Sequence, residues 1–189
     1  YNVIPWEEKT ARFFCDIKEG GTGKRFEKDS RLAVERAQGA LESAGFTKAY
    51  FGPELEFFVF DSVTFDHSLP IKGQGYSIES KEAAWTTGGT NHPINYKSGY
   101  YPATPQDTLQ GLRAKFVNCL ENDFGIFVEA HHHEVATAGQ CEINVRFDEM
   151  RKMADKVVTY KYVIKNLASA NNQIATFMPK PLFGDNGSG

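Results

Sequence analysis

The segment GPELEFFVFD, residues 52–61, restricts the possible folds of this chain more than any other. Side chains on a β-strand alternate between its two faces. One face therefore carries Glu54, Glu56, Phe58 and Phe60, and the other carries Leu55, Phe57 and Val59. Two largely apolar faces predict that residues 50–61 form one central strand that is covered on both sides. Two glutamates on such a strand are costly unless they form ion pairs or bind a metal ion.

A second segment, EAHHHEVATAGQCE, residues 129–142, also concentrates acidic side chains. Its pattern predicts two strands, 126–134 and 141–147, that pair through the short loop VATAGQ. Alternation divides the first strand into two faces, with Val128, His132 and Glu134 on one and Glu129, His131 and His133 on the other. Pairing through the loop brings Glu134 close to Glu142. Together with the two glutamates of the first segment, these make four carboxylates that line one site.

Four carboxylates in one site repel one another, so either their pKa values rise or bound cations keep them ionised. Hard oxygen ligands select Mg²⁺ or Mn²⁺ over zinc. The zinc motif H-E-x-x-H would need a histidine at Thr137, and no C-x-x-C pair exists. A cupin-like site has H-x-H and then a glutamate a few residues later. His131 and His133 form such a pair, but Glu134 follows it too closely and Glu142 too far away. We therefore expect the histidines to neighbour the metal or to pack. A single glutamate pair would more often form ion pairs, but two pairs on neighbouring strands favour a metal.

The composition is that of an ordinary globular domain. The chain has 189 residues, 41% hydrophobic and 24% charged, with a formal net charge of −3. This charge gives no reason to expect nucleic acid or an anionic membrane as a partner, and no apolar run could span a bilayer. Cys15, Cys119 and Cys141 are an odd number at unrelated spacings, which favours a reducing cytoplasmic location. Because no Met begins the chain and it stops within GDNGSG, we expect a piece of a longer protein.

Apolar periodicity and capping residues predict the remaining elements. They are a strand at 10–17, a helix from Ser30 to 44, a helix from Thr104–Pro105 to about 125, and a helix from Asp148 to about 171. The long polar segment 62–97 is expected to be functional or to form a subunit contact. Two prolines favour an extended C-terminal loop, 175–189. The GGTGK motif is not a P-loop, because Lys18 occupies its first glycine position and Arg25 follows its lysine.

Five blocks of the sequence closely resemble the type I glutamine synthetase family, in the order in which that family has them. The blocks are GPELEFFVFD, ESKEAAW, EAHHHEVATAGQCEI, YKYV and FMPKPLFGDNGSG. The resemblance covers essentially the whole chain. It implies a mixed α/β (α+β) catalytic domain in which a curved antiparallel β-sheet forms a funnel flanked by helices. Residues 1–17 would then be the end of an N-terminal β-grasp region with its linker, and residues 18–189 a catalytic domain truncated on its C-terminal side.

The resemblance also implies roles for individual residues. Glu56, Glu134 and Glu142 match ligands of a first divalent cation, and Glu54 matches a ligand of a second. Glu134 would also help ammonium to lose a proton. The remaining matches are a nucleotide-binding glutamate (Glu129), two residues that hold the substrate glutamate (Asn186 and Gly187), a tyrosine of the ammonium pocket (Tyr100) and a pocket histidine beside the metal ligands (His132).

The implied reaction is ATP-dependent ligation of ammonia to the γ-carboxylate of L-glutamate through γ-glutamyl phosphate, with Mg²⁺ or Mn²⁺ as cofactor. The family forms stacked rings, so we expect a homo-oligomer, a dodecamer by resemblance, and no activity from this piece alone. Three alternatives are a ligase that uses a larger amine such as a polyamine, a non-enzymatic structural relative, and an unrelated Mg²⁺-dependent phosphoryl-transfer enzyme. The intact VATAGQ loop favours ammonia, and the four glutamates argue against a relative that has lost its metals.

Overall fold

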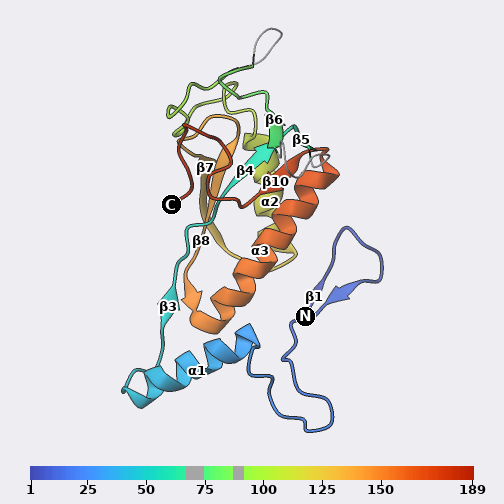
Figure 1. The fold of residues 1–189 in the computed structure, drawn as a ribbon, viewed down its shortest axis with the longest axis vertical. Helices are drawn as coiled ribbons and strands as arrows, with labels where there is room; N and C mark the ends of the chain where they lie inside the picture. The colour runs from blue at the N-terminus through green and yellow to red at the C-terminus, as the bar shows by residue number, and fades with distance from the viewer. Residues whose placement is uncertain (67–74, 87–91) are drawn as a thin grey trace.

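The computed structural model describes residues 1–66, 75–86 and 92–189, and this part of the chain has the predicted mixed α/β fold with antiparallel sheets. Its helices are α1 (Ser30–Ser43), α2 (Gln110–Asn122) and α3 (Met150–Ala170). Its strands are β1 (Asn2–Val3), β2 (Ala11–Arg12), β3 (Tyr50–Phe51), β4 (Glu56–Phe60), β5 (Ser62–Asp66), β6 (Gly75–Glu79), β7 (Val128–His133), β8 (Gln140–Val145), β9 (Asp148–Glu149) and β10 (Ile174–Thr176). Figure 1 shows α2 and α3 against the central sheet, and α1 near the beginning of α3.

The central sheet has the strand order β10-β4-β8-β7, and every pairing in it is antiparallel. The aromatic strand β4 lies between two neighbours, which confirms the prediction of a central strand. The predicted strand is nevertheless interrupted at residues 52–55, and β3 pairs separately with β9. Gly52 and Pro53 explain the interruption, because proline has no N–H to donate and glycine weakens a strand. The predicted pairing across VATAGQ is confirmed as β7 with β8.

Helices α2 and α3 cover one face of this sheet. Alternate residues of β4 and β8 point toward them and are at most 7% exposed: Phe57, Val59, Cys141, Ile143 and Val145. The helices contribute buried residues at the predicted spacing, among them Leu112, Phe116, Leu120, Tyr160 and Ile164. Burial of large apolar side chains stabilises by about 25 cal/mol per Å² of area removed from water, so this layer holds the sheet and the helices together.

The opposite face of the sheet has an apolar half and a polar half. Phe58 and Phe60 pack against Ile78, Leu182 and two alanines of the loop 135–139. Glu56 precedes them on the same face and is only partly buried, beside polar side chains of β8 and β7. The alternation predicted for β4 is therefore confirmed, and the polar half remains for the candidate site.

Two predicted helix starts are wrong, because residues near each predicted start form contacts outside the helix. Helix α2 begins at Gln110, since the Thr108 N–H and hydroxyl donate to the carboxylate of Glu82 instead of entering a helix. Helix α3 begins at Met150, because Asp148 pairs with Phe51 in the small sheet of β3 and β9.

The prediction for the first helix is wrong by one residue. The carboxylate of Asp29 accepts from Arg31 N at 3.1 Å, so Asp29 rather than Ser30 caps α1. The predicted strand 10–17 shrinks to β2, and its apolar residues Phe13 and Ile17 stay exposed. A strand without a buried face has little to stabilise it, which explains why β2 is short.

The polar segment 62–97 contains an unpredicted hairpin of β5 and β6. Residues 67–74 and 87–91 of this segment lie outside the described part of the chain. The functional role or subunit contact that we expect of the segment stays a prediction. Within the described ranges, none of the helices is both long and apolar enough to cross a bilayer.

Candidate metal site

Three neighbouring strands place acidic and imidazole side chains in one row on the polar half of the sheet. Glu56 of β4 is in register with Glu142 of β8, and Glu142 is in register with His132 of β7. Directly paired residues of antiparallel strands point to the same face, with Cβ atoms roughly 4.5–5.5 Å apart. The register therefore brings the first and second glutamate segments together.

Glu134 extends this row from the loop end of β7. His132 Nδ1 lies 3.4 Å from Glu134 Oε1, and His132 Nε2 lies 3.2 Å from Glu142 Oε2. One possible ligand atom of each residue lies within 4.8 Å of those of the other two. All three residues are at most 8% exposed. Among the described residues, these three have the geometry of a metal-binding group.

Burial and the neighbouring carboxylates raise the pKa values of Glu56 and Glu142. Burial and then the neighbouring carboxylates, Glu134 foremost, raise the pKa of Glu142 to about 7. Burial also raises the pKa of Glu56, which the Glu134 charge raises further although Gly189 N donates to it. A divalent cation would reverse these shifts, because it stabilises the ionised carboxylates.

Glu54 is exposed and precedes β4, so it lies outside the strand on which the sequence pattern placed it. Its charge is the smallest of the causes that raise the pKa values of Glu56 and Glu142, of which burial is the largest. Four carboxylates and one imidazole suit Mg²⁺ or Mn²⁺ better than the thiolate-rich or histidine-rich sets of zinc. The carboxylates have more negative charge than the nearby side chains balance, so a divalent cation fits this set of residues.

Gln140, the first residue of β8, ties Glu56 to the loop between the two strands. Its amide nitrogen donates to Glu56 Oε2 at 2.6 Å, and its amide oxygen accepts from Ala136 N at 2.7 Å. Gln140 is 1% exposed, so both contacts are shielded from water. Gln140 was not among the predicted site residues, although alternation puts it on the same face as Glu142.

Two adjacent tyrosines flank His132. Tyr100, the predicted residue, meets the imidazole edge-on with ring centroids 5.7 Å apart. Tyr101, which sequence analysis missed, stacks on the same ring with centroids 4.3 Å apart and planes 17° apart. Partial burial and then the charge of Glu134 raise the pKa of the Tyr100 hydroxyl.

Gly99 allows this tyrosine segment to lie flat against the end of β7. Its N–H donates to Val135 O at 2.9 Å. A Cβ at this position would lie 2.5 Å from Glu134 O and 2.7 Å from Ala136 O, so no other residue fits without moving the loop. The close approach places Tyr100 beside Glu134.

The predicted glutamate-binding residues Asn186 and Gly187 lie in a partly buried segment beside the row. A Cβ on Gly187 would lie 2.8 Å from Pro179 O, to which Ser188 N donates at 2.7 Å. Gly189 N donates to Glu56 Oε1 at 3.2 Å. The end of the chain is thus attached to the carboxylate row.

Glu129 lies apart from the row, near the other end of β7, and is exposed. A register shift between Val128 and Ala130 leaves it opposite no residue of β8. The same irregularity directs Val128 into the apolar core, so the prediction that Val128 shares a face with His132 is wrong. The nucleotide-binding role of Glu129 stays a prediction.

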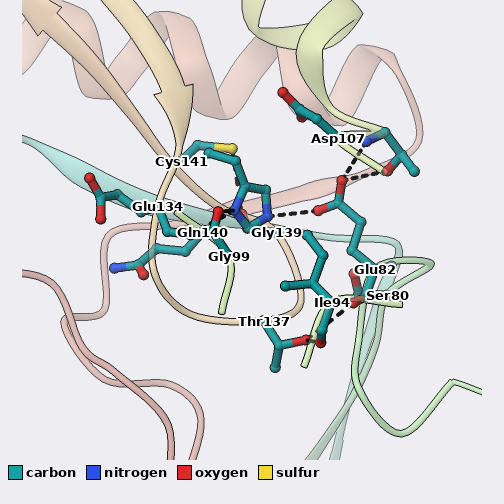
Figure 2. A network of polar contacts seen from close by, with 12 residues as sticks. Ser80, Glu82, Ile94, Gly99, Asp107, Glu134, Thr137, Gly139, Gln140 and Cys141 are labelled. Atoms are coloured by element: carbon teal, nitrogen blue, oxygen red, sulfur yellow. Dashed lines mark hydrogen bonds and ion pairs between the residues drawn. The ribbon is translucent and has the colours of Figure 1, made fainter. Parts of the chain in front are cut away.

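His133 lies on the opposite face of β7, in a buried polar network that Figure 2 shows. Its Nε2 lies 3.0 Å from Glu82 Oε2, and its Nδ1 lies 2.8 Å from Gly99 O. Burial alone would lower the pKa of His133, but the hydrogen bond from its ring to Glu82 and the charge of Glu82 raise it. In Figure 2 the carboxylate of Glu134 points away from this network.

A buried ion pair lies beside His133. Arg113 of α2 is 1% exposed, and its NH1 donates to Asp107 Oδ1 at 3.0 Å. The same guanidinium donates to His131 Nδ1 at 3.4 Å. Positive and negative groups are therefore matched on this side of the strand.

Known proteins resemble this chain in both sequence and structure. Residues 27–189 match the family model described as glutamine synthetase, catalytic domain. A glutamine synthetase from Sulfolobus acidocaldarius is 52% identical over 187 residues, which cover 99% of this chain and 39% of that protein. The glutamine synthetase of Escherichia coli K12 is 45% identical over 182 residues, which cover 93% and 38%. The cryo-EM structure of Plasmodium falciparum glutamine synthetase matches with a TM-score of 0.81 and 31% identity, over 92% of this chain and 34% of that one. The chain thus spans about two fifths of the length of its curated relatives.

Proposed function

The chain belongs to the glutamine synthetase catalytic-domain family, and we propose that the complete protein joins ammonia to the γ-carboxylate of L-glutamate, using ATP. The observation that supports this proposal is the row of Glu56, Glu142, His132 and Glu134, whose carboxylates form no ion pair with any lysine or arginine that the structure describes. The products would be L-glutamine, ADP and phosphate, as in nitrogen assimilation.

The chemistry of the substrate explains the use of ATP. Ammonia does not displace oxygen from a carboxylate, because the leaving group is too poor. Transfer of the γ-phosphoryl group of ATP to the glutamate carboxylate gives γ-glutamyl phosphate. Ammonia then attacks the carbonyl carbon, and phosphate leaves with the electrons of the broken C–O bond. When bound, Mg²⁺ or Mn²⁺ neutralises the phosphate charge that develops in the transfer.

The residues of this chain would bind and orient the reactants. Glu56, Glu134 and Glu142 would hold one cation, and Glu54 would contribute to a second. Glu134 would also accept a proton from ammonium in the pocket that Tyr100 lines. The other proposed roles are orientation of the substrate glutamate (Asn186 and Gly187), contact with the nucleotide (Glu129) and support of two ligand carboxylates (His132).

The assembly and the domain division are part of the same proposal. Residues 1–17 would end a β-grasp region, and residues 18–189 would form part of the catalytic domain. The complete protein would be a cytoplasmic homo-oligomer of stacked rings, a dodecamer by family resemblance. The isolated chain of 189 residues would be inactive, so glutamine formation by this chain alone would contradict the proposal.

The test is glutamine formation by the complete gene product from glutamate, ATP and ammonium, with Mg²⁺ or Mn²⁺. Glu134→Ala is the loss-of-function variant, and Glu8→Gln, at an exposed position near the beginning of the chain, is the control for a change at the surface. Activity that depends on ammonium, disappears in Glu134→Ala and persists in Glu8→Gln supports the proposal.

The same assay separates the alternatives. Turnover with a larger amine but none with ammonium would assign the protein to the amine ligases instead. A folded protein that is inactive with every amine would be a structural relative, and the proposed function would fail.

A further inference from the structure

Asp185 is buried where three segments that carry candidate site residues meet. It is 1% exposed. Its Oδ1 accepts from Lys97 N at 2.9 Å, and its Oδ2 accepts from Thr137 N at 2.8 Å. The two donors lie 88 and 48 residues away in the sequence, so a single carboxylate joins two distant loops to its own segment.

Each of the joined segments carries a residue proposed to act on substrate. Lys97 leads into the segment of Tyr100, and Thr137 follows Glu134 in the loop after β7. Asp185 itself directly precedes Asn186. The distances from the glutamate-binding segment to the metal-binding carboxylate and to the tyrosine therefore depend on the two hydrogen bonds of Asp185.

Both loops adopt backbone conformations that need such support. Lys97 has a φ of 57°, and Ala138, directly after Thr137, has a φ of 59°. Left-handed conformations are unfavourable for residues with a Cβ and persist only where the surroundings hold them. Asp185 accepts hydrogen bonds from the N–H of Lys97 itself and from the N–H of Thr137, which directly precedes Ala138.

We infer that Asp185 is a positioning residue that sets the place of Asn186 and Gly187 relative to Glu134 and Tyr100. It acts through two backbone N–H groups and contacts no reacting atom. The far end of its segment is attached separately, through Gly189 N and Glu56 Oε1. Loss of Asp185 would therefore release mainly the end that carries Asn186. This inference rests on the proposed function of the site.

The experiment compares Asp185→Asn with the unaltered complete gene product. Asparagine has nearly the same shape, but only its oxygen accepts hydrogen bonds, so one buried N–H loses its partner. The KM for glutamate is expected to rise at least about tenfold, equivalent to about 1.4 kcal/mol. The KM for ATP should stay within about twofold of its normal value. The proposed nucleotide contact, Glu129, lies at the other end of β7, so its position should not change.

Asp29→Asn is the matched control. Asp29 is also buried, at 5% exposed, and also accepts from two backbone N–H groups, those of Ile17 and Arg31, each at 3.1 Å, in addition to an ion pair with Arg25 at 2.9 Å. It lies at the start of α1, away from the row. Its variant should lose thermal stability as Asp185→Asn does, with both KM values unchanged. An equal rise of the glutamate KM in both variants would mean general destabilisation and would overturn the inference.

A second variant covers the case in which Asp185→Asn does not fold. Glycine adopts positive φ freely, so Asp185→Asn/Lys97→Gly relieves part of the strain. Its KM for glutamate should remain at least about threefold raised, equivalent to roughly 0.7 kcal/mol. A normal glutamate KM in either folded variant overturns the role of Asp185 while the synthetase function stands. If the unaltered protein forms no glutamine, the proposed function itself has failed, and the inference fails with it.

Discussion

His132 and His133 are neighbours in the sequence but belong to opposite electrostatic environments. His132 lies between Glu134 and Glu142, and no lysine or arginine of the described chain forms an ion pair with that row. His133 contacts Glu82, beside the buried pair of Arg113 and Asp107. The two sides of one strand therefore differ in whether the protein itself balances its charges.

This difference separates a structural network from a binding site. On the His133 side, each buried charge among the described residues has a partner, so no bound ion is needed to balance it. On the His132 side burial and repulsion raise the pKa of Glu142 to about 7, which costs stability and is relieved only by protons or cations. Imbalance of buried charge, more than burial itself, identifies the site.

The largest expected effect is on the balanced side. Arg113→Met in the complete protein leaves Asp107 as an unpaired buried charge, which should cost about 3–5 kcal/mol of unfolding free energy. Urea denaturation would measure it. Arg113→Met/Asp107→Leu, which removes both charges, should recover most of that loss. A single variant as stable as the parent would show that this side does not need its charge balance.

Glu142→Gln tests the unbalanced side and should have a stability effect of the opposite sign. Removal of one repelling carboxylate should leave the metal-free protein as stable as before or more stable. The affinity for Mn²⁺ should fall at least about tenfold, or about 1.4 kcal/mol, because a charged ligand is lost. Calorimetric titration with Mn²⁺ measures the affinity, and Glu8→Gln is the control. Unchanged affinity would remove Glu142 from the proposed ligands.

The pH dependence of stability should differ with and without metal. The pKa of Glu142 is about 7 in the folded protein against a usual value of 4.5, so the folded state binds more protons between these values. Stability of the metal-free protein should therefore fall as pH rises from about 4.5 to about 7. Saturating Mg²⁺ or the Glu142→Gln change should flatten this slope, as measured by thermal unfolding in chelator or in Mg²⁺. A slope that is the same in all three samples would contradict the repulsion within the row.

The smallest effect is expected from the ring that supports His132. Tyr101→Leu keeps an apolar side chain but loses the stacked contact at 4.3 Å. An aromatic pair contributes about 0.5–1.5 kcal/mol beyond its buried area, so a loss of at most that size is expected. Thermal unfolding would measure this loss, with Tyr96→Leu, next to Trp85, as the control. A much larger loss of Mn²⁺ affinity would instead show that Tyr101 holds His132 in place for the metal.

Local pattern in the sequence predicted the parts of the fold that depend on neighbouring residues. Alternation assigned the faces of β4, and helical periodicity found the buried stripes of α2 and α3, because each depends on which side of one element is apolar. The same reasoning failed at Val128, where an irregularity in pairing re-aims a side chain. It also failed at the start of α2, where Glu82 captures the N–H of Thr108 from 26 residues away.

The sequence by itself determined that this chain has a central aromatic strand, two glutamate-rich strands and too many carboxylates to leave unpaired. Only the tertiary structure decided which charges are matched. The register of β4, β8 and β7 aligns Glu56, Glu142 and His132, and the packing of α2 brings Arg113 to Asp107. Electrostatic energies depend on distance and burial in space, and sequence spacing fixes neither for groups on different elements.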